Sequence, residues 1–368
     1  MLAACSGASS PSTVDATIDA KGIVFDAGID AGPMYSAANP PLGDEVGPSL
    51  TVAAGWSAPR YLKGLPNLDN DGGWTDSVTV SRDGNTLYFG YSKRNAFQFL
   101  FKNGNEVIDG QSLTADHNTK FLQVFEAELG PSGYQVTRSG INPSDAIDVA
   151  AVAINEAKNI ALYTIYSIDP PGRRVHLSVR SGTSWTPAGA LSEPVNTAAT
   201  TCDDDNPFVI GSSTAGVVFW QSKRSDTQGG ACSDLGAPIR IFRAPVANGT
   251  LGSPQLVDGI ASAGSKDYEA SFAEDFSRAY WVKVDATSFS IRTADGDGQT
   301  YSNSSAVVSV VNFMPPYDGK IVDIGEPNVV SLPTVDVMYF RCGVARSTVA
   351  GNASDIQLKI CVTKRVKP

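Results

Sequence analysis

The stretch Asp76-Ser-Val-Thr-Val-Ser-Arg-Asp-Gly-Asn-Thr-Leu-Tyr-Phe89, which continues as Gly-Tyr-Ser-Lys-Arg94, decides the expected fold. An acidic residue opens an apolar strand, a turn with Asp, Gly and Asn follows, and an aromatic strand comes next. The outline returns in Asp205-Asn-Pro-Phe-Val-Ile210 and Val217-Val-Phe-Trp-Gln-Ser-Lys-Arg224. Both copies end in Phe-x-x-Ser-Lys-Arg, so the chain contains an internal repeat of strand pairs.

Three weaker copies complete the series. Each opens with an acidic residue and an apolar strand, and an aromatic strand lies after the next turn. The units recur at intervals of roughly 60 residues, which leaves room for about four short strands in each. The acidic residues that open the five units are Asp76, Asp148, Asp205, Glu269 and Glu326.

Further strands complete each unit. A third strand is predicted over residues 120–128, 174–179, 239–244, 288–292 and 356–362. The segments Trp56-Ser-Ala-Pro59 and Trp185-Thr-Pro187 are typical of an outermost strand that crosses to the next unit. Since the first of them precedes the first strand pair, we expect the N-terminal strand to complete the last unit and close a ring, which limits exposed sheet edges.

The Asp-Gly-x-x-Leu-Tyr-Phe strand pair, the Ser-Lys-Arg after it and the Trp-x-x-Pro crossings resemble WD40-like propeller repeats of the TolB-associated type, also called PD40. The resemblance covers residues 47–368 and is best in the first and third units. It implies an all-β fold with a single five-bladed β-propeller and no fixed activity, because this fold hosts many functions. A two-sheet sandwich is the alternative, but it would not naturally give units of this length.

The N-terminus has the features of an exported, tethered protein. Leu2-Ala-Ala-Cys5 resembles the lipobox of bacterial lipoproteins, in which the signal peptide is cut before the cysteine and Cys5 would carry the lipid. Residues 1–5 are then a signal-peptide remnant. Residues 6–46 are Asp/Ala-rich without a hydrophobic period, which predicts a flexible linker before the domain at 47–368. We expect a lipid-anchored protein of the bacterial cell envelope, periplasmic or on the outer surface, or a secreted one.

Four cysteines remain when Cys5 is set aside. Proximity in the sequence favours the disulfides Cys202–Cys232 and Cys342–Cys361. Four cysteines allow three pairings, and four buried free thiols are the alternative. In an oxidising compartment outside the cytoplasm, each disulfide could stabilise the fold by about 3 kcal/mol.

Composition narrows the range of partners. The formal net charge is −10, so phosphate backbones would be repelled and nucleic acid is not expected as a partner. No apolar run approaches the ~20 residues of a membrane-spanning helix, so a membrane would be reached only through the lipid anchor. The two histidines, His117 and His176, disfavour a multi-histidine metal site and Ser-His catalysis. A monomer that binds a glycan or an envelope protein is expected.

The five acidic residues that open the units form the main candidate site. The first strand of a propeller blade lines the central channel, so we expect these carboxylates to form a ring near one mouth. Crowded carboxylates cannot all ionise freely, so some of their pKa values should rise. Such a ring could catalyse glycoside hydrolysis, bind a cation or another ligand, or serve the fold alone. Asp148 and Glu326 are its candidate ligand-binding members.

A second resemblance implies catalytic roles. Five-bladed glycosidases of the arabinanase and xylosidase type carry an Asp, an Asp and a Glu on separate inner strands. By this resemblance Asp76 would be the general base, Asp205 the residue that tunes the pKa of the acid, and Glu269 the general acid. The motifs around these residues in that family are not recognisable in this sequence.

Other candidate binding residues lie close to the strand pairs. Trp74 stands in a glycine-rich loop two residues before the first acidic position and could face a ligand. Arg94 and Arg224 share a repeat position and are expected to pair locally or to contact a ligand. Oxygen ligands at close spacing, without the full EF-hand pattern, are offered by Asp203, Asp204 and Asp205. Calcium is therefore the one candidate cofactor.

Two classes of function follow. The first is a binding or scaffold propeller that recognises a glycan, peptidoglycan or protein partner on one face. The second is a glycoside hydrolase with an Asp/Glu acid–base pair in the central funnel. The first is favoured, because an acidic position kept in every unit is more often structural. An enzyme should show isolated carboxylates in an open pocket, whereas a scaffold should show carboxylates bonded to backbone N–H groups.

Overall fold

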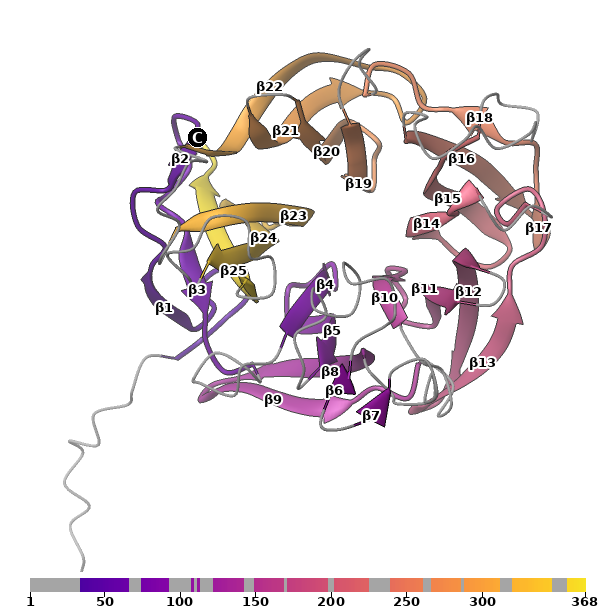
Figure 1. Cartoon of the computed structure of the whole chain (residues 1–368), viewed down its shortest axis with the longest axis horizontal. Helices are drawn as coiled ribbons and strands as arrows, with labels where there is room; N and C mark the ends of the chain where they lie inside the picture. Colours follow the sequence, from indigo (N-terminus) through magenta and orange to yellow (C-terminus); the bar gives the residue numbers. More distant parts are fainter. Residues whose placement is uncertain are drawn as a thin grey trace, which may run out of the picture. The chain divides into compact units, whose positions relative to one another are not determined.

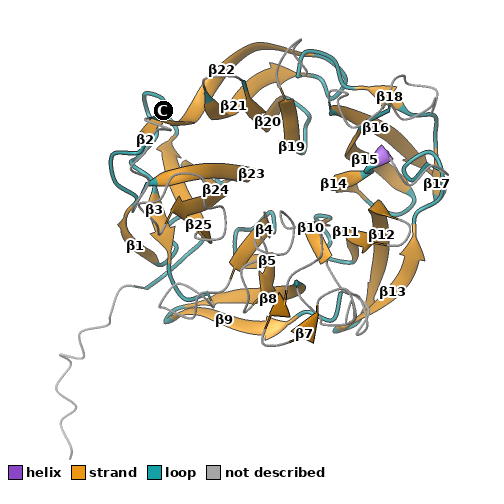
Figure 2. Ribbon diagram, viewed as in Figure 1, coloured by secondary structure: helices purple, strands orange, loops and turns teal. Residues whose placement is uncertain are grey.

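The computed structural model of the protein describes residues 34–65, 74–92, 107–108, 111–112, 122–141, 149–168, 171–197, 202–224, 239–260, 266–285, 288–311, 320–345 and 356–368. Met1–Pro33 and Met34–Pro368 form separate units, and all described residues belong to the second. Within them, all named elements are β-strands, and Figure 2 shows in addition a short helical turn beside β15. None of the described segments forms a helix with the length and apolar character that crossing a bilayer requires.

Five antiparallel sheets stand around a common axis, so the described unit is a five-bladed β-propeller (Figure 1). The first blade contains β4 (Trp74–Val80), β5 (Thr86–Ser92), β8 (Gln123–Gly130) and β9 (Gly133–Arg138). The second contains β10 (Val149–Ile154), β11 (Ile160–Ile168), β12 (Pro171–Ser181) and β13 (Ser184–Ala190). The third contains β14 (Asp205–Gly211), β15 (Ala215–Ser222), β16 (Arg240–Ala247), β17 (Thr250–Leu251) and β18 (Gln255–Leu256).

The last two blades each recruit a strand or strands from the N-terminal segment. The fourth contains β19 (Lys266–Phe272), β20 (Arg278–Val284), β21 (Phe289–Gly296), β22 (Tyr301–Val310) and β2 (Leu50–Val52). The fifth contains β23 (Ile321–Ser331), β24 (Val335–Ala345), β25 (Ile356–Val366), β3 (Arg60–Leu62) and β1 (Leu42–Glu45). A separate two-stranded pair is β6 (Val107–Ile108) with β7 (Gln111–Ser112).

The apolar side chains of the strands fill the spaces between neighbouring blades. Five buried clusters are present among the described residues, and each draws its members from two adjacent blades. Between the third and fourth blades, for example, the ring of Phe219 stacks on that of Phe272 with centroids 3.9 Å apart. Burial of aromatic and β-branched strand residues between sheets therefore holds the ring of blades together.

Ring closure follows the sequence-based prediction and extends it. β3 pairs with β25 through Tyr61↔Cys361, and Trp56 makes a β-bridge to Arg365, so N-terminal residues complete the fifth blade. In addition, β2 pairs with β22 and forms the edge of the fourth blade. The N-terminal segment therefore joins two blades rather than one.

The predicted third strands correspond to β8, β12, β16, β21 and β25, with ends that differ by a few residues. The boundary between linker and domain differs from the prediction. We expected the linker to extend to residue 46, whereas β1 (Leu42–Glu45) already pairs with β3 in the fifth blade. The folded unit begins at Met34, because the short β1 segment belongs to the closing sheet even though its composition resembles the linker.

Each innermost strand carries a β-bulge at the same place. In every blade the register between the first and second strands shifts at this place, and a non-glycine residue there adopts a positive φ between 44° and 55°. These bulge residues are Ser77, Ala151, Asn206, Glu269 and Glu326. A bulge turns the strand and frees its N–H from the ladder, so each blade presents one backbone donor near the axis.

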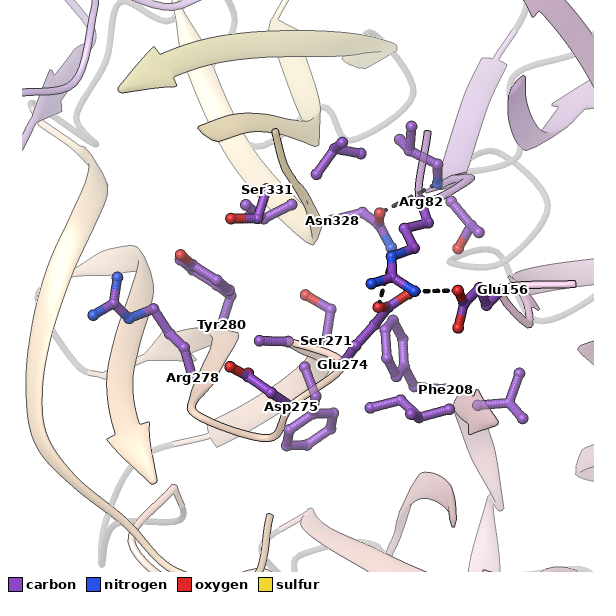
Figure 3. A pocket seen from close by; sticks show the side chains of 18 of the residues that line it. Arg82, Glu156, Phe208, Ser271, Glu274, Asp275, Arg278, Tyr280, Asn328 and Ser331 are labelled. Atoms are coloured by element: carbon purple, nitrogen blue, oxygen red, sulfur yellow. Dashed lines mark hydrogen bonds and ion pairs between the residues drawn. The ribbon is translucent and has the colours of Figure 1, made fainter. Parts of the chain in front are cut away.

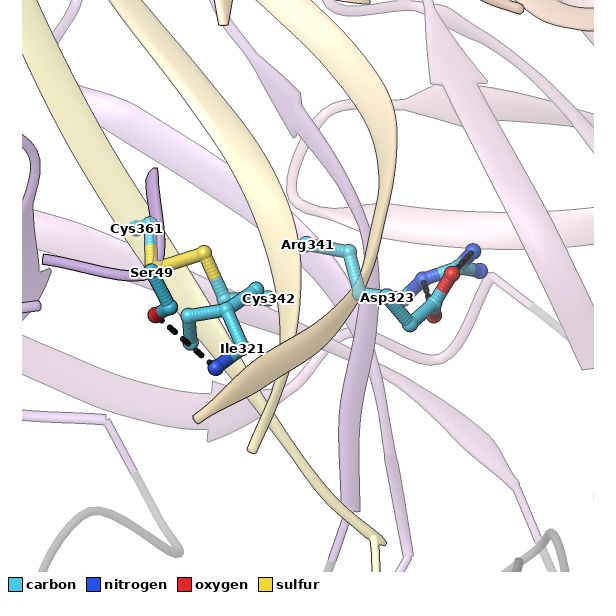
Figure 4. Close-up of a disulfide and its surroundings, with 6 residues drawn as sticks. All are labelled: Ser49, Ile321, Asp323, Arg341, Cys342 and Cys361. Carbon is cyan, nitrogen blue, oxygen red and sulfur yellow. Dashed lines mark hydrogen bonds and ion pairs between the residues drawn. A yellow bond between two sulfur atoms is a disulfide. The ribbon is translucent and has the colours of Figure 1, made fainter. Parts of the chain in front are cut away.

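The disulfide Cys342–Cys361, which the sequence predicts, joins β24 to β25 with a Cα–Cα distance of 5.9 Å (Figure 4). The residue before Cys342 on β24 is Arg341, and its side chain points away from the disulfide (Figure 4). Nearby, the Ile321 N–H donates to Ser49 Oγ at 3.0 Å and ties β23 to the N-terminal segment. The other predicted pair, Cys202–Cys232, includes a residue outside the described part of the chain.

We predict that replacing both Cys342 and Cys361 with alanine lowers the free energy of unfolding by about 3 kcal/mol, because the bond closes a loop of 19 residues. Urea denaturation under non-reducing conditions measures this. The wild-type protein in reducing agent is the control and should approach the variant. An unchanged urea midpoint in the double variant would contradict the prediction.

Candidate functional site

Hydrogen bonds at the axis join the blades to one another through their bulges. The Ala151 N–H donates to Ser77 Oγ at 2.8 Å, and Ser77 Oγ donates to Glu326 Oε1 at 2.7 Å. The Ser77 N–H reaches the same carboxylate, at 2.5 Å from Oε2. The Glu326 N–H donates to Glu269 Oε2 at 2.9 Å, and the Glu269 N–H donates to Gln221 Oε1 at 3.0 Å. These bonds link the second blade to the first, then the fifth, fourth and third.

The circuit closes between the third and second blades. Gln221 Nε2 donates to Asp205 Oδ2 at 3.3 Å, and the same oxygen forms an ion pair with Arg173 on β12 of the second blade. Adjacent blades are thus bonded pairwise all around the axis. We call this set the axial ring: Ser77, Ala151, Arg173, Asp205, Gln221, Glu269 and Glu326.

The guanidinium of Arg341 contacts four carboxylates on one side of the axial ring. Nη1 of Arg341 lies 3.4 Å from Asp76 Oδ1 and 3.5 Å from Glu269 Oε1. It also lies 3.8 Å from Glu326 Oε2, while Nε lies 3.1 Å from Asp323 Oδ2. All five side chains are between 9% and 14% exposed, so the cluster is largely shielded from water. We call these residues the arginine cluster.

The space for Arg341 comes from a glycine on the paired strand. Gly325 pairs with Arg341 at the position where the first blade pairs Asp76 with Gly90. A Cβ on Gly325 would collide with the Arg341 guanidinium and with Glu269 Oε2, both of which are held by the cluster. The fifth blade therefore reverses the arrangement of the first, with a glycine in place of the acid and an arginine in place of the glycine.

The protonation behaviour of the arginine cluster follows from crowding and burial. Burial raises the pKa of Glu269 to about 7, with further raising by the charges of Asp323 and Asp76, while Arg341 opposes the shift. Burial and Asp76 raise the pKa of Glu326 well above its usual value, and burial raises the pKa of Asp323. The surrounding acids hold the pKa of Arg341 far above its normal range, although burial acts against them. The guanidinium is permanently charged, and part of the carboxyl set is neutral near pH 7.

This geometry bears directly on hydrolysis. The two carboxylates of a glycosidase must flank the scissile bond. Here Nη1 of Arg341 contacts both Asp76 and Glu269, so these two carboxylates share one cation. The carboxylate of Glu269 also accepts a backbone N–H. The cluster therefore has the bonding expected of a scaffold.

The acidic residues chosen from the sequence do not occupy one equivalent position. Glu269 and Glu326 are bulge residues, whereas Asp76 and Asp205 each stand one residue before the bulge. Asp205 lies in the axial ring but pairs with Arg173 instead of Arg341. The extra residue of a bulge shifts the alternation of side chains between the two faces of the strand by one residue. Similar sequence patterns therefore place an acid either at the bulge or one residue before it.

The predicted cation site in the third blade is replaced by ion pairs. Asp203 pairs with Lys223, Asp204 pairs with Arg224 at 2.9 Å, and Asp205 pairs with Arg173. The described residues contain no group of three or more metal-ligating side chains that could hold a metal ion. The three consecutive carboxylates point to different cations, so they do not converge on a common ion.

Of the two roles expected for Arg224, the structure shows local pairing. Its side chain is 1% exposed, and it bonds Asp204 and the backbone carbonyls of Pro194 and Val195. Its guanidinium also lies 5.4 Å from the centre of the Trp220 ring. Arg224 therefore fixes the crossing from the second blade to the third.

Of the other residues predicted from the sequence, some lie within the described part of the chain and some outside it. Trp74 begins β4 and pairs with Ser92, and its contact with a ligand stays a prediction. His176 stacks on Tyr163, and burial together with Arg174 lowers its pKa to about 4. Four predicted residues lie outside the described part of the chain: Cys5, Arg94, Asp148 and Cys232.

A cavity that the sequence did not reveal lies beside the axial ring. It has a volume of about 440 Å³ and is lined by turns between first and second strands, including those of Arg82, Glu156 and Glu274 (Figure 3). Phe208 and Ser271 form part of its wall. A narrower space of about 40 Å³ at the level of the bulges shares several of these wall residues, so the ring forms the floor of the cavity.

Two features of the cavity concern ligand binding. The hydroxyl of Ser271 is buried, lacks a hydrogen-bond partner, and faces the space between Tyr280 and Asn328 (Figure 3). At the mouth, Arg82 from the first blade pairs with Glu156 of the second and, at 2.9 Å, with Glu274 of the fourth (Figure 3). Sequence reasoning missed these residues because turn residues carry no signal of what they face.

Comparison with known proteins supports the fold. No family model and no curated protein matches the sequence. A solved glycoside hydrolase is 12% identical over 81% of this chain and 89% of its own, with a TM-score of 0.50. The RS223 beta-xylosidase is 13% identical over 84% of this chain and 98% of its own, with a TM-score of 0.49. TolB from Acinetobacter baumannii is 10% identical over 80% of this chain and 54% of its own, with a TM-score of 0.33. At such identities the likeness shows the propeller fold alone.

We predict that Arg341→Met destabilises the propeller by about 3–5 kcal/mol, because four buried carboxyl groups lose their shared cation while the side-chain volume is kept. Thermal and urea denaturation measure the change. Arg278→Met is the matched control: its partner Asp295 is exposed, so the loss should stay within about 1 kcal/mol. Equal effects of the two changes would refute a central role for the arginine cluster.

A second prediction concerns pH. Glu269 has a pKa of about 7 in the folded protein against 4.5 normally, so its neutral form favours folding. This contribution is fully present below about pH 4.5 and is lost as the pH rises through about 7. The urea midpoint should therefore rise when the pH is lowered from about 8 to about 5.5. Glu269→Gln should flatten that dependence, and an equally steep dependence in the variant would show that other groups cause it.

Proposed function

We propose that this chain is a non-catalytic, glycan-binding β-propeller of the bacterial cell envelope, and that the cavity beside the axial ring is its binding site. The observation that carries the proposal is the bonding of the acidic residues. Arg341 stands between Asp76 and Glu269, and backbone N–H groups occupy the carboxylates of Glu269 and Glu326. The carboxylates at the axis are thus committed to the fold.

The cavity has the chemistry of a carbohydrate site. Its wall combines aromatic rings, among them Phe208 and Tyr280, with the amide of Asn328 and the hydroxyl of Ser271. Ligand sites commonly join apolar walls to a few polar groups that fix orientation. A volume of about 440 Å³ suits a short oligosaccharide. A protein loop is the competing occupant and would bind in place of a glycan.

Location at the envelope rests on the sequence features of the N-terminus. A lipid on Cys5 would tether the propeller through the Asp/Ala-rich linker, with no other contact with the membrane. We propose that the protein acts as a monomer, because ring closure leaves few free strand edges for pairing.

Hydrolysis is the second candidate function, and one observation favours it. Glu269 has a raised pKa, as a general acid requires, and glycoside hydrolases are among the proteins of similar fold. The full chain should be assayed with aryl-glycosides and polysaccharides, with and without calcium. Turnover that Asp76→Asn and Glu269→Gln abolish would reject the non-catalytic proposal. Turnover that both variants retain would reject these residues as catalysts.

We predict saturable binding of an oligosaccharide from a glycan array without turnover, and a fall in affinity of up to roughly tenfold in Ser271→Ala. The hydroxyl has no partner in the protein, so this change should leave stability intact. Titration calorimetry measures the affinity. Thr164→Val is the control, because it removes another buried hydroxyl that lacks a hydrogen-bond partner but does not line the cavity. Binding only to a protein partner, or equal effects of the two variants, would contradict the proposal.

A further inference from the structure

A cationic side chain of the protein itself occupies the mouth of the cavity. Arg82 lies in the turn between β4 and β5, and its guanidinium contacts Glu156 in the turn after β10 and Glu274 in the turn after β19 (Figure 3). The three residues come from three different blades. The guanidinium therefore bridges the opening that a ligand must pass.

These ion pairs are exposed and can be replaced. The side chain of Arg82 is 59% exposed, that of Glu156 52% and that of Glu274 39%. Ion pairs in such surroundings contribute little to stability because water screens them. Displacement of Arg82 by another cation would thus cost the fold little, in contrast to removal of Arg341 from its buried cluster.

The two glutamates form the open acidic element of the cavity wall. Among the other charged residues of the wall, Arg278 pairs with Asp295, and Asp336 pairs with Arg365. The remaining acid, Asp275, accepts hydrogen bonds from the N–H and the hydroxyl of Ser277. Within the described residues, Arg82 is the cation that pairs with Glu156 and Glu274. Burial and the negative charges of Glu156 and Asp275 raise the pKa of Glu274, which Arg82 opposes. In the absence of the Arg82 guanidinium, the space between Glu156 and Glu274 would favour another positively charged group.

A buried polar group lies deeper in the same cavity. The hydroxyl of Ser271 lacks a partner, although buried polar groups are normally hydrogen-bonded. It can donate to or accept from a ligand that enters between the glutamates. The complementary ligand carries a positive group for the mouth and hydroxyl groups for the wall.

We propose that the cavity binds an amino-sugar oligosaccharide whose ammonium group replaces the Arg82 guanidinium between Glu156 and Glu274. This inference rests on the proposed glycan-binding function and names its ligand class. In the free protein Arg82 forms ion pairs with both glutamates, and the ammonium group of the ligand replaces it on binding. The ligand's ring hydroxyls would contact Ser271.

The test compares two ligands that share one backbone and differ in charge. Tetramers of glucosamine and of N-acetylglucosamine have the same sugar chain, but only the first carries ammonium groups. With the full chain, calorimetry should give at least tenfold tighter binding of the glucosamine tetramer. This preference should fade as the pH is raised and the amines lose their protons.

Variants of the full chain identify the position. Arg82→Ala should tighten binding of the glucosamine tetramer several-fold, because the competing cation is gone. Glu156→Gln combined with Glu274→Gln should remove the preference for the charged tetramer. Arg278→Ala is the control, since this arginine lines the cavity but pairs with Asp295. Thermal denaturation should show that all of these exposed changes leave the fold intact.

The outcomes separate the two proposals. Equal binding of both tetramers, or weaker binding by Arg82→Ala, would overturn the amino-sugar assignment and leave glycan binding in place. Retention of the preference in the double glutamine variant would also overturn it. Failure to bind either tetramer or any glycan of the array would remove the proposed function as well.

Discussion

The meeting of one arginine with four buried carboxyl groups is the interaction on which the centre of this propeller depends. A charged carboxylate costs several kcal/mol to bury alone, and Arg341 offsets that cost for acids from the first, fourth and fifth blades. A guanidinium offers five donors in one plane, so it can serve several acceptors together, which a lysine ammonium does less well. The cluster holds three blades at the axis, while the apolar clusters hold neighbouring blades farther out.

The bulge common to all five innermost strands explains why the axis is so fully bonded. Each bulge presents a backbone N–H near the axis, and four of these donors bond to a side chain of a neighbouring blade. These positions join the blades of this propeller to one another. The likeness to glycoside hydrolases lies in the propeller fold alone. In this chain Arg341 contacts acids from three blades, and Gly325 makes room for its guanidinium.

The sequence predicts the blades well because each strand pair repeats an apolar pattern, and it predicts the closing strand because a Trp-x-x-Pro segment precedes the first unit. It does not predict the register at the axis. The acids Asp76 and Glu269 look equivalent along the chain, but Glu269 is the bulge residue of its strand, whereas Asp76 stands one residue before the bulge of its own strand. Arg341 was not identified from the sequence, because its role depends on the pairing of β23 with β24. The one signal in the sequence is Gly325, which stands where the first unit carries Asp76. Three consecutive aspartates likewise cannot reveal that each faces a different cation.

In the proposed function, the floor of the cavity belongs to the fold and its mouth to ligand recognition. Two of the wall residues shared by the cavity and the narrow level of the ring are already fixed: Thr79 donates to the Val152 carbonyl, and Asn328 accepts the Val80 N–H. A ligand that rests on this floor would order few protein groups on binding, and pre-organisation of this kind preserves affinity. Selectivity must then arise at the mouth, where Arg82 and its glutamates are exposed and weakly held. Charges at the mouth can therefore change without disturbing the buried cluster, so one stable propeller could serve ligands of different charge.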